Sequence, residues 1–553
     1  MPLTLYRNGS VYSAADPLAT AMLVDGDTVA WVGGEHAATS LADARMQVVD
    51  LAGALVTPGF VDSHVHVTET GLALGSVDLG VAATLGLALD LVAAAAAAAP
   101  GIVLGHGWDE NNWPEGRPPT LAELERAAPG RMVYLSRVDV HSAVVSAALA
   151  GHCGLAELDG WLGEGLVVRE AHHGARAESR RLEPAERTRV QRRALDAAAA
   201  AGYVAVAEMA APHVGSAEDL ASLAALSGAA GSGAAGSGAA VEVLPYWGQA
   251  VRSAEEARGV LAALGTPVLG LAGDLNIDGS IGSRSALLRE PYADAPGTHG
   301  SSYLDVDAVA DHLAAASELG LQAGFHLIGD GAMDIAVQGL ERAAARVGLD
   351  KVRAAGHRFE HAEMADAAAI AALAAHSVTV SVQPVFDALW GGPDGLYERR
   401  LGAARGATLN PIAAYFSAGV PVCLGSDSPV TPLNPWASVR AALMHHRSDQ
   451  RISARAAFIG HTRAGWRAAR EGNPLMGQLV PGAPASYAIW EVEELMVQVA
   501  DERVQSWSTD PRARTPLLPA LDTGSDPRTL ATVHRGRELF ATDGFALAEA
   551  AAG

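Results

Sequence analysis

The clearest hydrophobic pattern lies in residues 305–383, where apolar positions change repeatedly between the period of a helix and that of a strand. Residues 305–319 carry apolar side chains at helical spacing and end at Gly320. The segments that follow are a strand at 321–327, a helix at 333–347, a strand at 358–361, a helix at 365–375 and a strand at 378–383. This alternation predicts parallel strands that are connected by helices.

The two ends of the chain follow a different pattern, in which short apolar runs are separated by turn signals. In residues 1–55 the signals are Asn8-Gly9, Asp25-Gly26 and Gly33-Gly34. Such spacing predicts β-hairpins. Similar runs recur at 486–491 and 532–540, so we expect β-structure at both ends.

Two segments between the ends lack a regular apolar pattern. Residues 228–240 repeat only Gly, Ala and Ser, which predicts a flexible surface loop. Residues 169–187 are strongly polar, and we interpret them as a second loop, mobile near the site or simply surface.

Composition narrows the class of protein. The chain has 553 residues, of which 49% are hydrophobic and 18% charged. This composition is typical of a well-buried globular enzyme, and the length suits a large barrel with a smaller domain. The formal net charge of -23 argues against nucleic acid as a partner, because phosphate binding requires clustered Lys and Arg.

Cysteine content and the apolar runs indicate the compartment. Cys153 and Cys423 are the only cysteines, so a disulfide framework and C-x-x-C motifs are excluded. The N-terminal residues contain no apolar targeting segment, and the alanine run 93–99 is too short to cross a bilayer. We therefore expect a cytoplasmic protein that does not bind membranes.

A histidine pair is the most informative motif for function. The predicted strand 56–63 leads directly into His64-Val65-His66. Because side chains alternate in a strand, His64 and His66 point to the same side. Two neighbouring imidazoles can hold one metal ion, although the pair alone also suits two polar residues at a strand end.

Other predicted strands also end in a potential ligand. His326, His361 and Asp427 each follow an apolar strand. The carboxyl ends of parallel barrel strands share one face, where barrel enzymes build their active sites. Imidazoles to hold an ion and a carboxylate to move protons are what a hydrolytic metal site requires. The histidine pair, His326, His361 and Asp427, each at the end of a predicted strand, together predict such a site.

The motifs around these residues resemble those of the amidohydrolase superfamily, in particular the branch typified by N-substituted formamide deformylase. The resemblance runs nearly end to end. Its motifs are Pro58–His66, Gly105–Asp109, Asp278–Arg284, His326–Asp330, Arg358–His361, Gln383-Pro384, Gly425–Pro429 and Gly477–Gly482.

This resemblance implies an α/β fold, a distorted (β/α)₈ TIM-like barrel with a small β-sandwich formed by both termini. We assign 1–55 and 475–553 to the sandwich and 56–474 to the barrel with insertions. The resemblance also implies that His64, His66 and Asp427 bind a buried divalent metal, most simply Zn²⁺. His326 and His361 would bind a second ion or face the substrate. A homodimer is a further expectation from the family.

The chain departs from the family at the residue that bridges two metals, usually a carboxylated lysine. Counting back four residues from Asp278 places Asp274 at that position, and the only lysine, Lys351, lies outside the motifs. The side chain of Asp274 keeps a carboxylate but is several ångströms shorter than a carboxylated lysine. Either its strand shifts inward, or Glu208 at the end of the apolar strand 203–207 substitutes, or only one metal binds. A simple capping role for Asp274 stays open.

Candidate substrate-binding residues lie in loops after predicted strands. Aromatic side chains in such loops serve packing as often as recognition. The candidates are Trp108, Asp109, Trp113, His141, Arg284 and Gln383, with Trp390 and Trp436 behind them. Arg284 could bind a substrate carboxylate or pair with Asp278.

The expected activity is hydrolysis of a non-peptide amide or N-formyl bond in a small molecule. Metal-activated water would lose its proton to Asp427, which returns it to the leaving nitrogen, while His326, His361 or the metal stabilises the oxyanion. Deamination is an alternative, but a glutamate that deaminases place three residues after the histidine of the fifth strand is missing after His326. The same residues also suit hydrolysis of an ester or carbamate, or a binding protein without catalysis.

Overall fold

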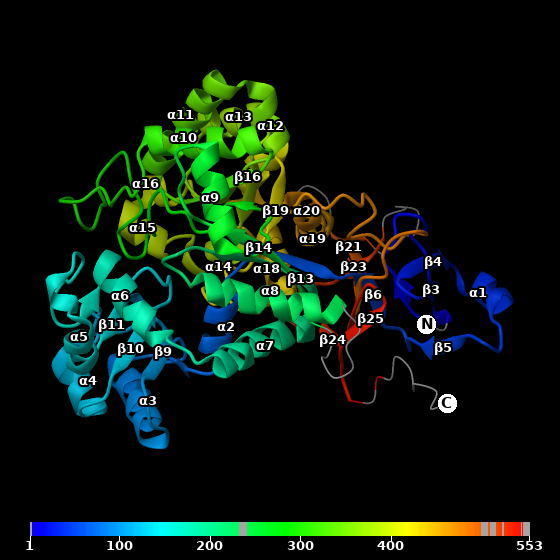
Figure 1. Cartoon of the computed structure of the whole chain (residues 1–553). Helices are drawn as coiled ribbons and strands as arrows, with labels where there is room; N and C mark the ends of the chain where they lie inside the picture. Colours follow the sequence, from blue (N-terminus) through cyan, green and yellow to red (C-terminus); the bar gives the residue numbers. More distant parts are fainter. Residues whose placement is uncertain are drawn as a thin grey trace.

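Eight parallel strands form the centre of the molecule in the computed structural model, which describes residues 3–231, 240–498, 507–508, 516–522, 525–543 and 545 (Figure 1). Each strand pairs with the next along the chain, from β7 to β19. The strands are β7 (Phe60–Val65), β13 (Tyr203–Ala210), β14 (Glu242–Trp247), β15 (Gly270–Leu271), β16 (Gln322–Leu327), β17 (Arg358–His361), β18 (Thr379–Val382) and β19 (Val422–Leu424). The predicted (β/α)₈ barrel is confirmed.

The barrel closes where its first and last strands meet. The amide of Asp427 donates to the carbonyl of His64 at 2.8 Å, and the amide of His66 donates to the carbonyl of Ser428 at 3.0 Å. These two bonds join segments that are more than 350 residues apart in sequence. Closure therefore depends on the same residues that carry the predicted ligands.

Helices surround the barrel, and several of them bury apolar side chains in the same cluster as its strands (Figure 1). The helix α10 illustrates the agreement with the sequence: it is capped by the Asp305 side chain and ends at Gly320, whose φ of 68° is one that glycine adopts with little strain. The helices are α2 (Val67–Ala73), α7 (Pro184–Ala200), α8 (Ala217–Gly231), α9 (Ala254–Leu264), α10 (Val306–Leu319), α11 (Asp330–Val347), α12 (Leu349–Ala355), α13 (Ala367–Ala375), α14 (Pro384–Trp390), α15 (Leu396–Leu401), α16 (Ala403–Gly406), α17 (Ile412–Ser417), α18 (Pro435–Leu443), α19 (Ala454–Gly460) and α20 (Arg463–Ala468).

An insertion between β7 and β13 forms a sheet of its own, which the sequence pattern did not reveal. Its strands are β8 (Val77–Asp78), β9 (Val103–Trp108), β10 (Val133–Arg137), β11 (Ala143–Val145) and β12 (Leu166–Val167). It carries α3 (Leu85–Ala98), α4 (Leu121–Ala127), α5 (Ala147–Cys153) and α6 (Arg169–Ser179). Figure 1 shows this unit in cyan and blue beside the barrel. The expectation of a loop at 169–187 is wrong, because α6 and the start of α7 occupy it.

Strands from both chain ends form further sheets. One sheet has the order β4-β3-β1-β5, and a second, β2-β6-β20-β24-β25, combines the two ends. The bounds are β1 (Leu3–Arg7), β2 (Ser10–Val11), β3 (Ala21–Asp25), β4 (Thr28–Gly33), α1 (Glu35–Leu41), β5 (Gln47–Asp50), β6 (Leu55–Pro58), β20 (Tyr487–Glu491), β24 (Arg528–His534) and β25 (Arg537–Ala541). A small sheet joins β21 (Leu495–Gln498), β22 (Trp507–Ser508) and β23 (Leu518–Pro519). The proposed domain boundaries stay a prediction.

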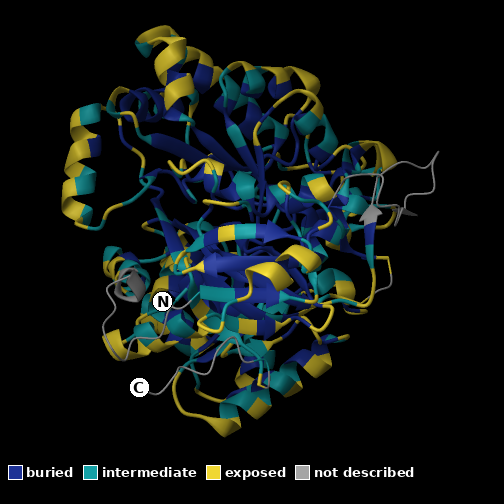
Figure 2. Ribbon diagram, turned by 90° about the vertical axis from the view of Figure 1, so that its right-hand side faces the viewer, coloured by how far each residue is buried: buried dark blue, intermediate teal, exposed yellow. Residues whose placement is uncertain are grey.

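Burial follows this architecture. In Figure 2 the barrel strands are almost entirely buried, and exposed residues gather on the outer faces of the helices. No helix within the described ranges is long and apolar enough to cross a membrane. Of the glycine-rich segment 228–240, the first four residues end α8, and 232–239 lie outside the described residues.

A core leucine provides a test of this packing. Leu340 of α11 is fully buried in the same apolar cluster as Val309 and Leu313 of α10. We expect Leu340→Ala to lower the free energy of unfolding by about 3–5 kcal/mol, because it leaves a cavity in a close-packed core. Leu87→Ala, at a side chain that is 43% exposed, should cost less than about 1 kcal/mol. Urea unfolding followed by circular dichroism measures both, and equal effects would contradict the packing.

Candidate metal centre

Two histidines and two aspartates meet at the carboxyl end of the barrel. Nε2 of His64 lies 3.3 Å from Oδ1 of Asp427 and 3.4 Å from Oδ1 of Asp274. Nε2 of His66 lies 3.3 Å from the same Asp427 oxygen and 3.1 Å from Oδ2 of Asp274. Donor atoms from three barrel strands or the segments after them thus converge within one small volume.

Asp274 reaches this cluster because its backbone leaves the regular strand. β15 ends at Leu271, and Gly273 follows with φ of 112°. A Cβ on Gly273 would lie 2.8 Å from the carbonyl oxygen of Ala210, so only glycine allows this approach. Leu275 and His326 then resume parallel pairing through an amide-to-carbonyl bond of 3.1 Å. The backbone shift brings a short carboxylate inward.

A buried ion pair orients His64. Nδ1 of His64 lies 2.9 Å from Oε2 of Glu360, and Arg358 donates to both oxygens of that carboxylate. Arg358 also donates to the carbonyl of Ser63 at 2.7 Å. Burial raises the pKa of Glu360, but Arg358 and His64 lower it to about 2 overall. An ionised Glu360 accepts the Nδ1 proton of His64 and so leaves Nε2 as the ligand atom.

A similar contact orients His361. Its Nδ1 lies 2.8 Å from the amide oxygen of Gln383, which fixes that nitrogen as the donor and leaves Nε2 free to bind an ion. His361, His64 and Asp274 offer ligand atoms that lie within 4.8 Å of one another. His326 stacks edge-on to His361 with ring centroids 4.5 Å apart, outside that group.

Several polar atoms of the cluster fit a bound cation. Nε2 of His64, Oδ1 of Asp274 and Oδ1 of Asp427 are buried and have no hydrogen-bond partner among the described residues. Burial raises the pKa of Asp427, but His64 and His66 lower it far below its usual value, so this carboxyl is ionised. Burial lowers the pKa of His64 and His66, but Asp427 and Asp274 raise it above its usual value. A divalent metal that displaced these protons would find imidazoles and carboxylates as its donor set.

Glu208 lies near the cluster but has a different partner. Its Oε2 accepts a hydrogen bond from the amide of Val67 at 2.7 Å, and it belongs to none of the ligand groups found in the described part of the chain. Burial raises the pKa of Glu208 to about 7. The geometry therefore favours Asp274 over Glu208 as the fourth side chain.

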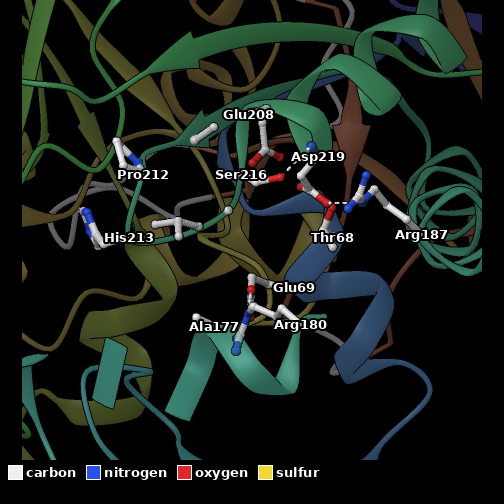
Figure 3. Close-up of a pocket in the computed structure, with 13 residues that line it drawn as sticks. Thr68, Glu69, Ala177, Arg180, Arg187, Glu208, Pro212, His213, Ser216 and Asp219 are labelled. Carbon is white, nitrogen blue, oxygen red and sulfur yellow. Dashed lines mark hydrogen bonds and ion pairs between the residues drawn. The ribbon is translucent and has the colours of Figure 1, made fainter. Parts of the chain in front are cut away.

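Glu208 instead lines a cavity of about 190 Å³ between the barrel and α6. Figure 3 shows His213 on one side of this cavity and the Arg187–Asp219 pair on the other. Arg180 and Glu69 face each other across an ion pair. Both arginines already form ion pairs with carboxylates of the same cavity, so their charges are not available to a ligand.

A second, small cavity, of about 30 Å³, opens directly onto the cluster. His326, His361 and Asp427 contribute to its lining, and Asp139 and His141 reach it from the insertion. Its other lining residues are Ser280, Ile281, Gly282, Ile328, Glu363, Phe386, Trp390, Leu396, Tyr397 and Val430. A mostly apolar cavity that ends at polar groups is typical of a small-molecule site.

The insertion is attached firmly to this cavity. Asp139 accepts hydrogen bonds from Ser280 at 2.7 Å and Ser283 at 2.8 Å, and Arg137 lies 3.0 Å from the same carboxylate. The His141 ring lies 5.1 Å from that of His326. A connection between β10 and β11 thus closes one side of the barrel mouth.

Four of the predicted pocket residues lie elsewhere. Trp108 and Trp113 pack in the core of the insertion, where their indole nitrogens donate to carbonyls of Leu135 and Ala82. Asp109 forms an ion pair with Arg137 at 2.9 Å. Trp436 packs against Phe60, Phe458 and Trp490.

Arg284 also lies away from the cluster. It pairs with Asp294 at 2.7 Å. Its other expected partner, Asp278, accepts backbone hydrogen bonds from Leu287, Ile328 and Gly329 instead. The loop after β15 is held by these bonds.

Sequence reasoning assigned no role to Glu360, Glu363 or Asp139. A signal for Glu360 was present, since Arg358 and Glu360 lie two residues apart in a strand and so share a face. Asp139 had no such signal, because its place depends on how the insertion packs.

The barrel and its cluster of ligand atoms define a metal-dependent hydrolase. A model of the Amidohydrolase family matches residues 47–540, and the chain belongs to that family. It is therefore an enzyme that hydrolyses carbon–nitrogen bonds, and the predicted resemblance to the superfamily is confirmed.

Relatives of the chain support this assignment. Protein LONG AFTER FAR-RED 3 of Arabidopsis thaliana is 28% identical over 518 residues, which cover 88% of this chain and 86% of the plant protein. N-substituted formamide deformylase of Arthrobacter pascens is 29% identical over 150 residues, which cover 26% and 28% of the two chains. An uncharacterized metal-dependent hydrolase from Pyrococcus furiosus has a crystal structure that superposes with a TM-score of 0.67 at 26% identity, covering 88% of this chain and 98% of the other.

Proposed function

We propose that this enzyme hydrolyses a non-peptide amide or N-formyl bond of a small molecule, with Asp427 as the general base and acid. The observation that carries the proposal is the cavity in which Asp427, His326 and His361 lie together at one end of an apolar wall. His64, His66, Asp274 and Asp427 would hold a divalent ion, most simply Zn²⁺, which suits nitrogen and oxygen ligands. His361, with or without His326, would hold a second one.

Each residue at the site would have its own role in the reaction. A bound divalent ion supplies a water of lowered pKa and polarises a carbonyl oxygen. Asp427 accepts the proton of the attacking water and returns it to the departing nitrogen. His361 already donates its Nδ1 proton to Gln383, so His326 or His141 is better placed to donate to the developing oxyanion.

The residue three positions after His326 favours amide hydrolysis over deamination. Gly329 occupies the place where deaminases carry a glutamate, and a Cβ there would lie 2.0 Å from the carbonyl oxygen of Leu287. No side chain fits at that position without displacing the loop. Esters and carbamates stay open as substrates, because they require the same attack on a carbonyl.

A substrate screen tests the proposal. Purified full-length protein, with its metal content measured by mass spectrometry, is assayed with N-formyl and N-acetyl benzylamines and with benzyl esters. We expect at least one bound ion per chain and faster release of amine than of alcohol. Hydrolysis of the esters alone would overturn the bond assignment, and a folded protein without metal would overturn the centre itself.

The contact between Glu360 and His64 gives a prediction about metal affinity. Glu360→Gln keeps the shape of the side chain but loses the charge that fixes the imidazole proton. We expect the affinity for Zn²⁺ to fall by about 10–100-fold. Competition with a chromogenic chelator measures this, and Glu341→Gln on the exposed face of α11 is the control. Unchanged affinity in Glu360→Gln would contradict the role of His64 as a ligand.

The expected homodimer and cytoplasmic location stay predictions. Light scattering on the eluting protein distinguishes a chain of 56.6 kDa from its dimer.

A further inference from the structure

Glu363 is a buried carboxyl that the proposed reaction does not use. It lies two residues after His361 and is 3% exposed. It lines the same cavity as Asp427, and its Oε2 has no hydrogen-bond partner among the described residues. The neighbour beside it, Tyr397, is a neutral hydroxyl, so the buried carboxyl has no charged partner, which is costly and requires a reason in the way the site is used.

The backbone around Glu363 is held in place on both sides. His361 and Ala362 adopt φ of 68° and 48°, so two successive residues turn the chain at the end of β17. The Ala362 carbonyl accepts a bond from the Tyr415 hydroxyl at 2.6 Å, and the Glu363 carbonyl accepts one from the amide of Asn410 at 2.9 Å. Strain of this kind at a site is retained when it places a side chain for function.

Other carboxylates around the cavity already have partners. Asp139 is matched by Arg137 and two serine hydroxyls. Asp427 belongs to the metal cluster. None of the described residues that line the cavity is Arg or Lys, so no cationic side chain of the cavity lies beside Glu363.

The wall beside Glu363 is apolar and aromatic. Phe386 and Trp390 lie 4.7 Å apart between ring centroids, and His361 stacks on Phe386 at 5.9 Å with an angle of 14° between the planes. Ile281, Ile328 and Val430 complete the wall. An apolar group that packs along this wall, where the cavity of about 30 Å³ opens outward, would place a polar end against Glu363.

We propose that Glu363 is the specificity residue of this cavity, and that it selects substrates whose apolar group carries an amine or another N–H donor. The scissile bond would lie at Asp427, and the donor would lie at Glu363. This assignment rests on the proposed function for the reaction, but the recognition itself is a binding property.

Binding of three small probes tests the selection without turnover. 4-Methylbenzylamine, 4-methylbenzyl alcohol and 4-methylbenzoate share one ring and differ in the polar end. Calorimetry on the metal-loaded full-length enzyme should give tighter binding for the amine than for the alcohol, while the benzoate, which can bind the metal ion, reports on binding at the other end of the cavity. Equal binding of the amine and the alcohol would overturn the proposal.

The variant Glu363→Gln tests whether amine binding depends on the charge of Glu363 or on that of Asp427. A charge-assisted hydrogen bond is stronger than a neutral one, so we expect the variant to bind the amine about 10-fold less tightly and the alcohol unchanged. Glu341→Gln should change neither. An equal loss for amine and alcohol, with circular dichroism unchanged, would mean that Glu363 only shapes the wall and would overturn its selective role.

The reaction and the recognition can fail separately. If amine binding depends on Glu363 while amides and N-formyl amines are not cleaved, the proposed reaction is wrong and the recognition stands. If cleavage occurs at the same rate with para-aminomethyl and para-methyl N-formylbenzylamines in both Glu363 forms, the reaction stands and the recognition is wrong.

Discussion

Asp427→Asn should reduce turnover by about 10²–10⁴-fold, the range that a general acid–base group contributes. The amide keeps the size of the side chain and one oxygen close to His64 and His66, so part of the metal affinity should survive. Turnover must therefore be divided by metal content, measured on the same sample by mass spectrometry.

The matched control is Asp350→Asn, an exposed aspartate in α12 that belongs to none of the ligand groups in the described part of the chain. It should retain full turnover. Full turnover in Asp427→Asn would exclude the carboxylate as the proton carrier, and a parallel loss of metal and activity would assign it to ion binding alone.

Asp274→Ala should remove most of the bound metal, whereas Glu208→Gln should keep it. Asp274 places its two oxygens 3.4 Å from His64 and 3.1 Å from His66, while Glu208 accepts from the amide of Val67 instead. Loss of a ligand should weaken affinity beyond the roughly 10–100-fold that a supporting residue contributes.

Metal analysis after dialysis against a mild chelator compares the two variants with the parent protein. Restored occupancy at high Zn²⁺ would show that Asp274→Ala still folds. Full metal in Asp274→Ala together with loss in Glu208→Gln would reverse the assignment.

The sequence was sufficient to predict the barrel because its apolar periods are local. The helix at 305–319 and the strand at 358–361 were located to within a residue, since Gly320 and the polar neighbours mark their ends. At 532–540 the pattern predicted one run, but the chain turns at Gly536, where φ is 72°, and forms the hairpin β24–β25.

The site was less accessible to sequence reasoning, because its details depend on contacts between distant segments. His64 and Asp427 could be placed by the strands that carry them. The inward shift of Asp274 depends on Gly273 packing against Ala210, which no local pattern reveals. Trp108 was expected in a substrate wall, but its loop belongs to a separate sheet whose core it fills.

The bonds that close the barrel have a consequence for the order of events during synthesis. His64 emerges early from the ribosome, but Asp427, whose amide bonds to its carbonyl, is made more than 350 residues later. The ligand set therefore cannot be complete until almost the whole barrel exists, and an ion captured there would fasten the first strand to the last. A nascent chain stalled before residue 427 should carry the histidine pair yet retain no metal, which makes ion uptake a late step in the maturation of this enzyme.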